Sequence, residues 1–139
     1  MVSEHLNSFL CNMNVLARRV ASQNNLSLSQ YYTLTNISSI GISMSELSLV
    51  LGVDNSTLTR NINILIKRSL LKKQQSSKDK REQIVLLSSK GMETVKKLDI
   101  DMEKLLNQFI SGIDEMQRQS FLDTLEQLNW KMNCYINDL

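Results

Sequence analysis

One stretch of the sequence, residues 43–91, constrains the fold most strongly, because it carries start and stop signals for helices at close intervals. Ser43 and Glu46 fit a capping box, in which a serine begins a helix and a glutamate three positions later returns the hydrogen bond. Gly52 is placed to end that helix, and Asp54 to begin the next. Two short helices joined by a glycine-containing turn predict a helix-turn-helix.

A β-hairpin is predicted directly after these two helices. Residues 71–75 and 83–87 are expected to be its strands, and the second is rich in residues that favour strands. Residues 76–81 form a polar, charged loop between them, and Ser88 is placed to begin another helix. A hairpin in this position is the wing of a winged helix-turn-helix.

Long amphipathic helices are predicted on both sides of this region. Apolar residues recur at spacings of three and four over residues 3–22, 27–39, 88–112 and 114–139. The chain has no proline, so these helices can continue without interior breaks. We therefore expect one mainly α subunit with a small β-hairpin wing (α+β), in which long N- and C-terminal helices flank a winged helix-turn-helix at residues 27–91.

The net charge of +2 conceals a strong asymmetry along the chain. The stretch from Arg60 to Arg81 holds eight basic residues and one acidic residue, whereas the rest of the chain holds 8 basic and 13 acidic residues. A compact basic region on an otherwise acidic body indicates a polyanionic partner. Scattered surface lysines would not concentrate half of the basic residues in one short stretch.

The second helix of the predicted helix-turn-helix, residues 55–69, has a polar face with no acidic residue. Ser56, Arg60, Asn63 and Lys67 share this face, and apolar residues at Leu58, Ile62, Leu65 and Ile66 share another. Short polar groups allow the backbone to approach base edges, and arginine can hold guanine through two hydrogen bonds. The pattern favours base recognition in the DNA major groove, although any surface helix has a polar face.

The loop of the predicted wing carries Lys78, Lys80 and Arg81. A projecting hairpin can reach a flanking minor groove, whose negative potential attracts a guanidinium group. Two roles are open for Asp79. It can orient the Arg81 guanidinium through a charge-assisted hydrogen bond, it can be a turn residue, or it can be both.

These motifs resemble the MarR family of bacterial transcriptional regulators, which shows a leucine-rich helix-turn-helix, a wing with an Asp-x-Arg element and a Leu-Thr-x-x-Gly helix start. The match covers residues 27–91, and it departs from the family pattern at Ser88, where threonine is usual. The matching pieces are Leu28-Ser29-Gln30-Tyr31, Ser45-Glu46-Leu47, the run from Asp54 to Arg60, Asp79-Lys80-Arg81 and Leu87-Ser88-Ser89-Lys90-Gly91.

The resemblance implies a homodimer that binds a palindromic operator in double-stranded DNA, with residues 1–24 and 92–139 forming the dimerisation part. The apolar stripes of the end helices support this expectation, because so small a chain has too little interior to bury both. Residues assigned to the major groove are Asn55, Ser56, Thr57, Thr59, Arg60 and Asn63. Lys78, Asp79, Lys80 and Arg81 are assigned to the wing contact, with Arg81 in the minor groove, and Ser45 and Lys67 to DNA phosphates.

Two features are candidates for sensing a signal. Tyr31 and Tyr32 are candidates to line a pocket for a small-molecule effector, although aromatic residues at a helix start are more often part of the core. Cys11 is a candidate redox site, but no basic cluster that would activate a thiol lies near it in the sequence. Cys134 is the other cysteine, and the two lack metal-ligand spacing.

The leading interpretation is a DNA-binding transcriptional regulator, in particular a repressor. The alternative is a winged-helix module that binds other proteins and has lost DNA binding. The sequence shows no catalytic set of histidine, aspartate and serine, no glycine-rich phosphate loop and no metal motif, so we expect neither an enzyme nor a cofactor. No apolar run is long enough to span a membrane, and we expect a cytoplasmic protein.

Overall fold

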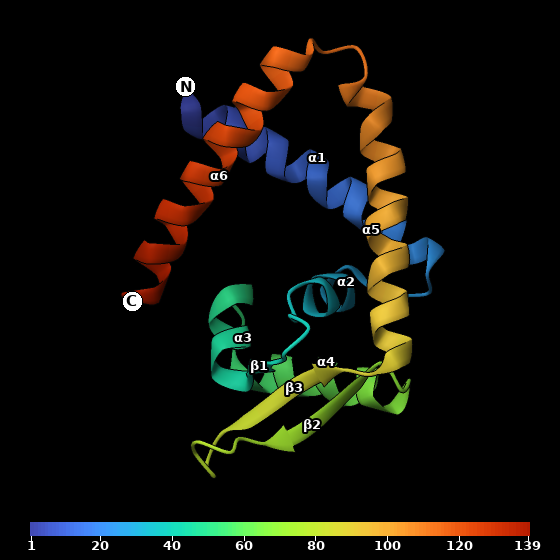
Figure 1. The fold of residues 1–139 in the computed structure, drawn as a ribbon, viewed down its shortest axis with the longest axis vertical. Coiled ribbons are helices and arrows are strands. Elements are labelled where there is room, and N and C mark those ends of the chain that lie inside the picture. Colours follow the sequence, from blue (N-terminus) through green and yellow to red (C-terminus); the bar gives the residue numbers. More distant parts are fainter. The chain divides into compact units, whose positions relative to one another are not determined.

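A computed structural model describes all residues, 1–139, and shows six helices and one small sheet (Figure 1). The chain divides into two compact units, Met1–Met102 and Glu103–Leu139. The elements in chain order are α1 (Val2–Gln23), α2 (Leu28–Thr35), β1 (Ile42–Ser43), α3 (Met44–Leu51), α4 (Asn55–Lys67), β2 (Leu71–Gln75), β3 (Gln83–Leu87), α5 (Ser89–Ile110) and α6 (Glu115–Asn137). The predicted mainly helical fold with a β-hairpin wing is confirmed.

The predicted helix-turn-helix is formed by α3 and α4. The Ser43 side chain accepts a hydrogen bond from the backbone N–H of Glu46 and begins α3. Gly52 ends α3 in the left-handed conformation, with φ of 64°, a backbone angle that suits glycine. The Asp54 side chain then begins α4 by accepting from the backbone N–H of Thr57.

The capping box predicted at Ser43 is only half formed, because one of its two hydrogen bonds is absent. The Glu46 side chain returns no hydrogen bond, because Ser43 is also the last residue of β1 and its main chain lies in the sheet. The reciprocal box forms instead at the start of α2, between Ser27 and Gln30. Helix α2 is also shorter than the predicted range 27–39, because the chain after it turns to enter β1.

The wing strands β2 and β3 form over the predicted residues, and they pair antiparallel from Leu71 opposite Leu87 to Gln75 opposite Gln83. The sequence did not predict β1, which pairs with β3 and makes a three-stranded sheet in the order β1-β3-β2. Gly41 precedes β1 with φ of +87°, and a Cβ there would lie 2.8 Å from Ile84 Cγ2. A close approach to β3 therefore requires glycine at this position.

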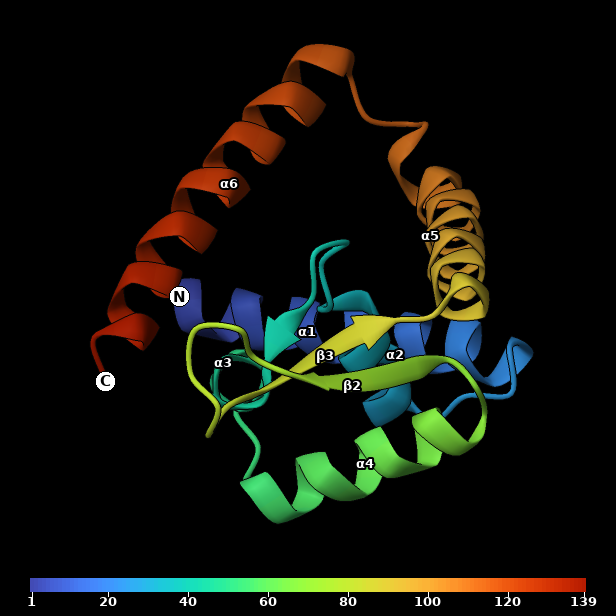
Figure 2. The same ribbon diagram turned by 60° about the horizontal axis from the view of Figure 1, so that its bottom comes forward.

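The hydrophobic core of the chain lies in the first unit. Helix α4 contributes Leu58, Ile62 and Leu65, all fully buried, and it contacts α2, α3 and β2. Burial of each such side chain stabilises the fold by about 1.5–3 kcal/mol. Figure 2 shows α4 running along one side of the sheet, with its outer face away from α2. The core thus fixes which face of α4 remains free.

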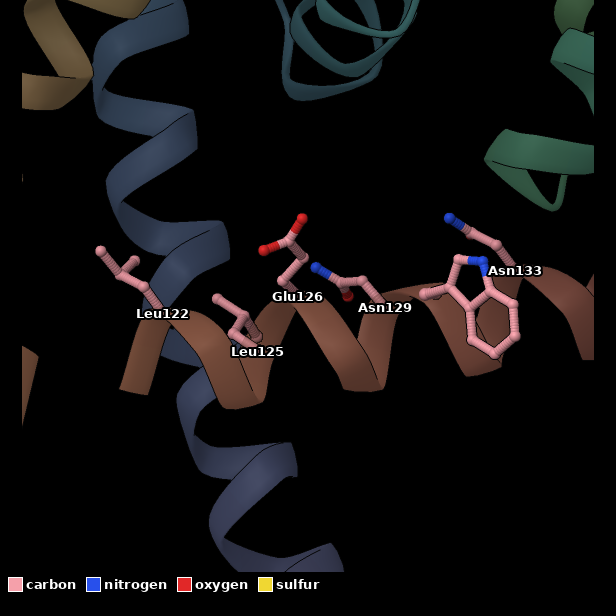
Figure 3. A pocket seen from close by; sticks show the side chains of 6 residues that line it. Leu122, Leu125, Glu126, Asn129 and Asn133 are labelled. Atoms are coloured by element: carbon pink, nitrogen blue, oxygen red, sulfur yellow. The ribbon is translucent and has the colours of Figure 1, made fainter. Parts of the chain in front are cut away.

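The second unit contains the end of α5 and all of α6. No side chain of α6 is buried. Its apolar residues follow an alternating spacing of four and three, at Phe121, Leu125, Leu128, Met132, Tyr135 and Leu139. An open depression along the helix is lined by Leu122, Leu125, Glu126, Asn129, Trp130 and Asn133 (Figure 3). It is a helix surface and not an enclosed cavity, because all of its lining comes from one helix.

Candidate nucleic-acid interface

The free face of α4 carries the residues predicted to read bases. Asn55, Ser56, Arg60, Asn63 and Lys67 are exposed on this helix. Thr57 and Thr59 are half-buried at its edges. The structure therefore places the predicted base-reading residues together on the surface of one helix.

A dense hydrogen-bond cluster holds the N-terminus of α4. Asp54 Oδ1 accepts from the Ser56 hydroxyl and from the backbone N–H of Thr57, both at 2.7 Å. These bonds, that from Ser56 first, lower the pKa of Asp54 to about 2. The Ser56 hydroxyl donates its only hydrogen to Asp54, so it presents only its acceptor lone pairs to a partner.

Two side chains that no sequence motif indicates as anchors, one on α4 and one at its C-cap, hold the helix on its neighbours. Asn61 is half-buried, and its side-chain amide donates a hydrogen bond to the hydroxyl of Ser29 in α2. Arg68, the C-cap residue of α4, donates from Nη1 to the backbone carbonyl of Asn25 at 2.7 Å. Both contacts join residues that are more than 30 positions apart in the sequence, so no local pattern indicates them.

The wing loop, residues 76–82, is closed by hydrogen bonds between its own residues. The backbone N–H of Ser76 donates to the carbonyl of Glu82 at 2.9 Å, and the N–H of Glu82 donates to the carbonyl of Asp79 at 3.0 Å. Lys78, Lys80 and Arg81 are all exposed on this loop. The loop therefore holds its three cations outward in an ordered turn.

Asp79 takes the turn role of the two roles that were open. Its Oδ1 atom accepts from the backbone N–H of Arg81 at 2.9 Å. Neither of the two ion pairs in the chain joins the Asp79 carboxylate to the Arg81 guanidinium. The guanidinium therefore lies outside any ion pair, and Asp79 positions it only by fixing the backbone.

Ser45, predicted to contact a DNA phosphate, has an internal partner. Its hydroxyl donates a hydrogen bond to Oε1 of Glu82 at 2.8 Å. Glu82 was not among the predicted site residues, because nothing in the local sequence links it to α3. Lys67, the other predicted phosphate contact, is exposed at the end of α4.

The two candidate effector residues lie in the first unit. Tyr31 is buried and its ring meets that of Tyr32 edge to face, with 5.4 Å between the centroids. Burial raises the pKa of both tyrosines, and the charge of Asp99 raises that of Tyr31 further. The Tyr32 hydroxyl donates to the side chain of Asn14 in α1. The hydrogen bond of Tyr32 therefore joins α2 to α1, and the buried ring of Tyr31 packs against that of Tyr32.

The two cysteines, Cys11 and Cys134, are both exposed thiols. No cluster of three or more histidine, cysteine, aspartate or glutamate side chains is arranged to hold a metal ion. No helix combines the length and the apolar character that crossing a bilayer requires.

A helix-turn-helix followed by a basic hairpin, with a free polar face on its second helix, defines the class of winged helix-turn-helix proteins. The model of the MarR family matches residues 24–82, which contain α3, α4 and most of the wing. This match confirms the resemblance to the MarR family that the sequence motifs indicate.

Solved structures of MarR proteins share the fold of nearly the whole chain. A MarR protein from Peptoclostridium difficile is 22% identical with a TM-score of 0.80, and the match covers 97% of this chain and 89% of that one. A MarR transcriptional regulator from Methanosarcina mazei Go1 is 19% identical with a TM-score of 0.82, over 96% and 97% of the two chains. A mutant of S. aureus MepR bound to an oligodeoxyribonucleotide is 15% identical with a TM-score of 0.64, over 95% and 98%. The family is one of transcription regulators and not of enzymes.

Proposed function

We propose that this chain is a sequence-specific transcriptional regulator that binds double-stranded DNA as a homodimer. The observation that carries the proposal is the pairing, within one folded unit, of a polar face on α4 and a basic wing loop. The face holds no acidic side chain, and the loop holds three exposed cations. MepR of S. aureus, which has this fold, has been solved with an oligodeoxyribonucleotide, and this supports DNA as the partner.

In the proposed complex, α4 lies in the major groove. Arg60 is the residue best suited to specific recognition, because it is exposed and its guanidinium can donate two hydrogen bonds to guanine. Asn63 can pair with adenine, and Ser56 can accept from a base amino group. Asn55, Thr57 and Thr59 complete the surface at the edges of the helix. Lys67 and the amino end of α3 at Ser45 approach phosphates.

The wing is proposed to contact the DNA beside the α4 site. Arg81 enters the minor groove, where a narrow groove strengthens the negative potential around its guanidinium. Lys78 and Lys80 approach the phosphates on either side. Asp79 supports this contact by holding the backbone of Arg81 in its turn.

Residues 1–24 and 92–139 are proposed to form the dimerisation part. The apolar residues of α6 support this, because Tyr135 is 69% exposed and Trp130 is 67% exposed in the single chain. Exposed large apolar side chains at helical spacing are typical of an interface. Two-fold symmetry would present two α4 helices and two wings to a palindromic operator.

The mode of regulation is proposed to be repression in the cytoplasm, since a dimer seated on an operator blocks the DNA that it covers. Release by a small molecule near Tyr31 and Tyr32, or by oxidation at Cys11, is the proposed means of control. The exposure of Cys11 supports access by an oxidant, whereas the tyrosine contacts require a ligand to move Tyr32 from Asn14.

Salt-dependent binding to a short mixed-sequence DNA duplex tests the proposal. Affinity should fall steeply as salt rises, because phosphate contacts release counterions from the duplex. Arg81→Ala removes one cation from each of the two wings, so it should lower the salt slope of the dimer by about two and weaken binding to all sequences. Lys96→Ala, which removes an exposed cation from α5, is the matched control and should leave the slope unchanged. Binding without salt dependence, or none at all, would favour the alternative of a protein-interaction module.

A further inference from the structure

The wing loop is joined to the rest of the protein by a single side-chain hydrogen bond. Most of the hydrogen bonds that residues 76–82 make stay within the hairpin, as between Gln75 and the carbonyl of Lys80. The exception is the bond from the Ser45 hydroxyl to Glu82 Oε1, at 2.8 Å. This bond links the base of the loop to the first turn of α3.

Glu82 lies at the base of the wing loop, where the loop joins strand β3. Its carbonyl and its N–H both close the loop, through Ser76 and Asp79. The adjoining strand β3 is held on its other edge only where Ile84 and Val85 pair with β1. The loop therefore projects beyond the last residue pair that the sheet fixes.

Ser45, the partner of Glu82, belongs to a chain of contacts that ends at α4. The Ser45 hydroxyl lies 3.3 Å from the hydroxyl of Ser43, which begins α3 by accepting from the N–H of Glu46 at 3.1 Å. Ser43 is buried, with 4% of its surface exposed. Helix α3 in turn packs against α4. A movement of the wing base is thus opposed by contacts that also define where α4 lies.

Apart from its hydrogen bond to Ser45, the negative charge of Glu82 is unfavourable for DNA binding. A carboxylate beside the basic loop repels phosphates and weakens the attraction of the whole surface for DNA. Its position near the amino end of α3, where a negative charge is favourable, and its bond to Ser45 offset part of that repulsion. The Ser45 hydroxyl has one hydrogen, so it cannot donate to a phosphate while it donates to Glu82.

We propose that Glu82 is a positioning residue for DNA binding. Its hydrogen bond to Ser45 sets the angle between the wing loop and the helix pair α3–α4. That angle determines whether Arg81 and the base-reading face of α4 reach one DNA site together. The inference rests on the proposed function for its consequence at DNA, but the positioning itself is a property of the free protein.

The first test is amide hydrogen exchange of the wing in the free protein. Loss of one charge-assisted hydrogen bond in Glu82→Ala should raise the exchange of the Ser76 and Glu82 amides about fivefold. Ser45→Ala should raise it to the same extent. Glu82→Gln should behave like the wild type, because its side-chain oxygen still accepts from Ser45. Equal exchange in wild type and Glu82→Ala, or failure of Glu82→Gln to restore protection, would overturn the proposal.

The second test is the ratio of affinities for a selected operator and for a mixed-sequence duplex. Glu82→Ala should lower this ratio about tenfold, whereas Glu82→Gln should keep it and tighten binding to both duplexes, because it removes a negative charge. Glu93→Ala is the matched control for charge, since it removes an exposed carboxylate from α5. The Ser45→Ala/Glu82→Ala double variant should be no worse than either single one, because the two side chains act through one bond. Additive losses would contradict the pairing.

The two tests separate the two proposals. A wild-type protein that binds no DNA, but whose wing loosens in Glu82→Ala, would reject the proposed function and keep the positioning role. A protein that binds an operator with the same ratio in Glu82→Ala and wild type would reject the positioning role alone.

Discussion

The two units of the chain differ in how far they bury their apolar side chains. Every buried side chain lies between Ala17 and Met102, in the unit that holds the helix-turn-helix and the wing. Residues 103–139 contain no buried side chain, although α6 carries apolar residues at a regular spacing of four and three. The difference teaches that the first unit, Met1–Met102, has a core of its own, whereas α6 needs a further surface to bury its seam.

The largest effect is expected from truncating the α6 seam. Met132 and Tyr135 are 45% and 69% exposed, and a dimer would cover both. Each truncation to alanine removes on the order of 2 kcal/mol of apolar burial per protomer. Two-fold symmetry counts each loss twice, about 8 kcal/mol for the two residues together, so the Met132→Ala/Tyr135→Ala variant should raise the dimer dissociation constant by several orders of magnitude. Sedimentation equilibrium measures this constant directly.

Lys131→Ala is the control for this variant, because Lys131 lies on α6 but outside the seam. It should leave the dissociation constant within a factor of about two. A wild-type protein that is monomeric at high concentration, or a seam variant that dimerises as tightly as the wild type, would remove α6 from the dimer interface.

The core of the first unit should respond to a single deletion within it. Ile62→Ala removes a side chain with no exposed surface from α4, and it should lower the free energy of unfolding by about 2–5 kcal/mol. Ile64→Ala on the same helix is the matched control, since that side chain is 39% exposed. Its cost should stay below about 1 kcal/mol. Both values come from urea unfolding at one fixed protomer concentration, because the proposed dimerisation would contribute to apparent stability. Equal losses of stability in the two variants would show that Ile62 does not belong to the core of this unit.

The smallest effect concerns the cap of α4. The pKa of Asp54 is lowered from 3.8 to about 2, so its ionised form is favoured in the folded protein. A lowered pKa contributes stability that is present above pH 3.8 and is lost as the pH falls toward 2. Asp54→Asn keeps an acceptor for Thr57 but has no charge to lose. The stability advantage of the wild type over this variant should therefore be constant from pH 7 to 5 and should shrink below pH 4.

Thermal unfolding of both proteins across this pH range checks the expectation for the cap. An advantage of the wild type that grows as the pH falls would contradict the assignment of the charged carboxylate as the capping form.

Local signals in the sequence predicted most of the winged helix-turn-helix. Gly52 and Asp54 marked the turn between the two helices, because a left-handed residue and a side-chain cap act within a few positions. Strands β2 and β3 formed over the predicted residues, because a polar loop separates two runs that favour strands. The exposed face of α4 followed from helical periodicity alone.

Features that depend on distant residues were missed. Strand β1 is only two residues long and forms because it pairs with β3, so no run of strand-forming residues predicts it. Glu82 contacts Ser45 across 37 positions, and Asn61 contacts Ser29 across 32. From the sequence, an ion pair between Asp79 and Arg81 could not be distinguished from a turn role for Asp79, since both use the same spacing of two residues.

Selection of bound fragments from a random pool of duplex DNA tests the central claim most directly. A dimer with two α4 helices and two wings should enrich one palindromic consensus, with half-sites about one helical turn apart. Arg60→Ala should relax the preference at one base position in each half-site and cost about 1–3 kcal/mol on the selected sequence. A pool that remains random after selection with the wild-type protein would contradict sequence-specific DNA recognition by this chain.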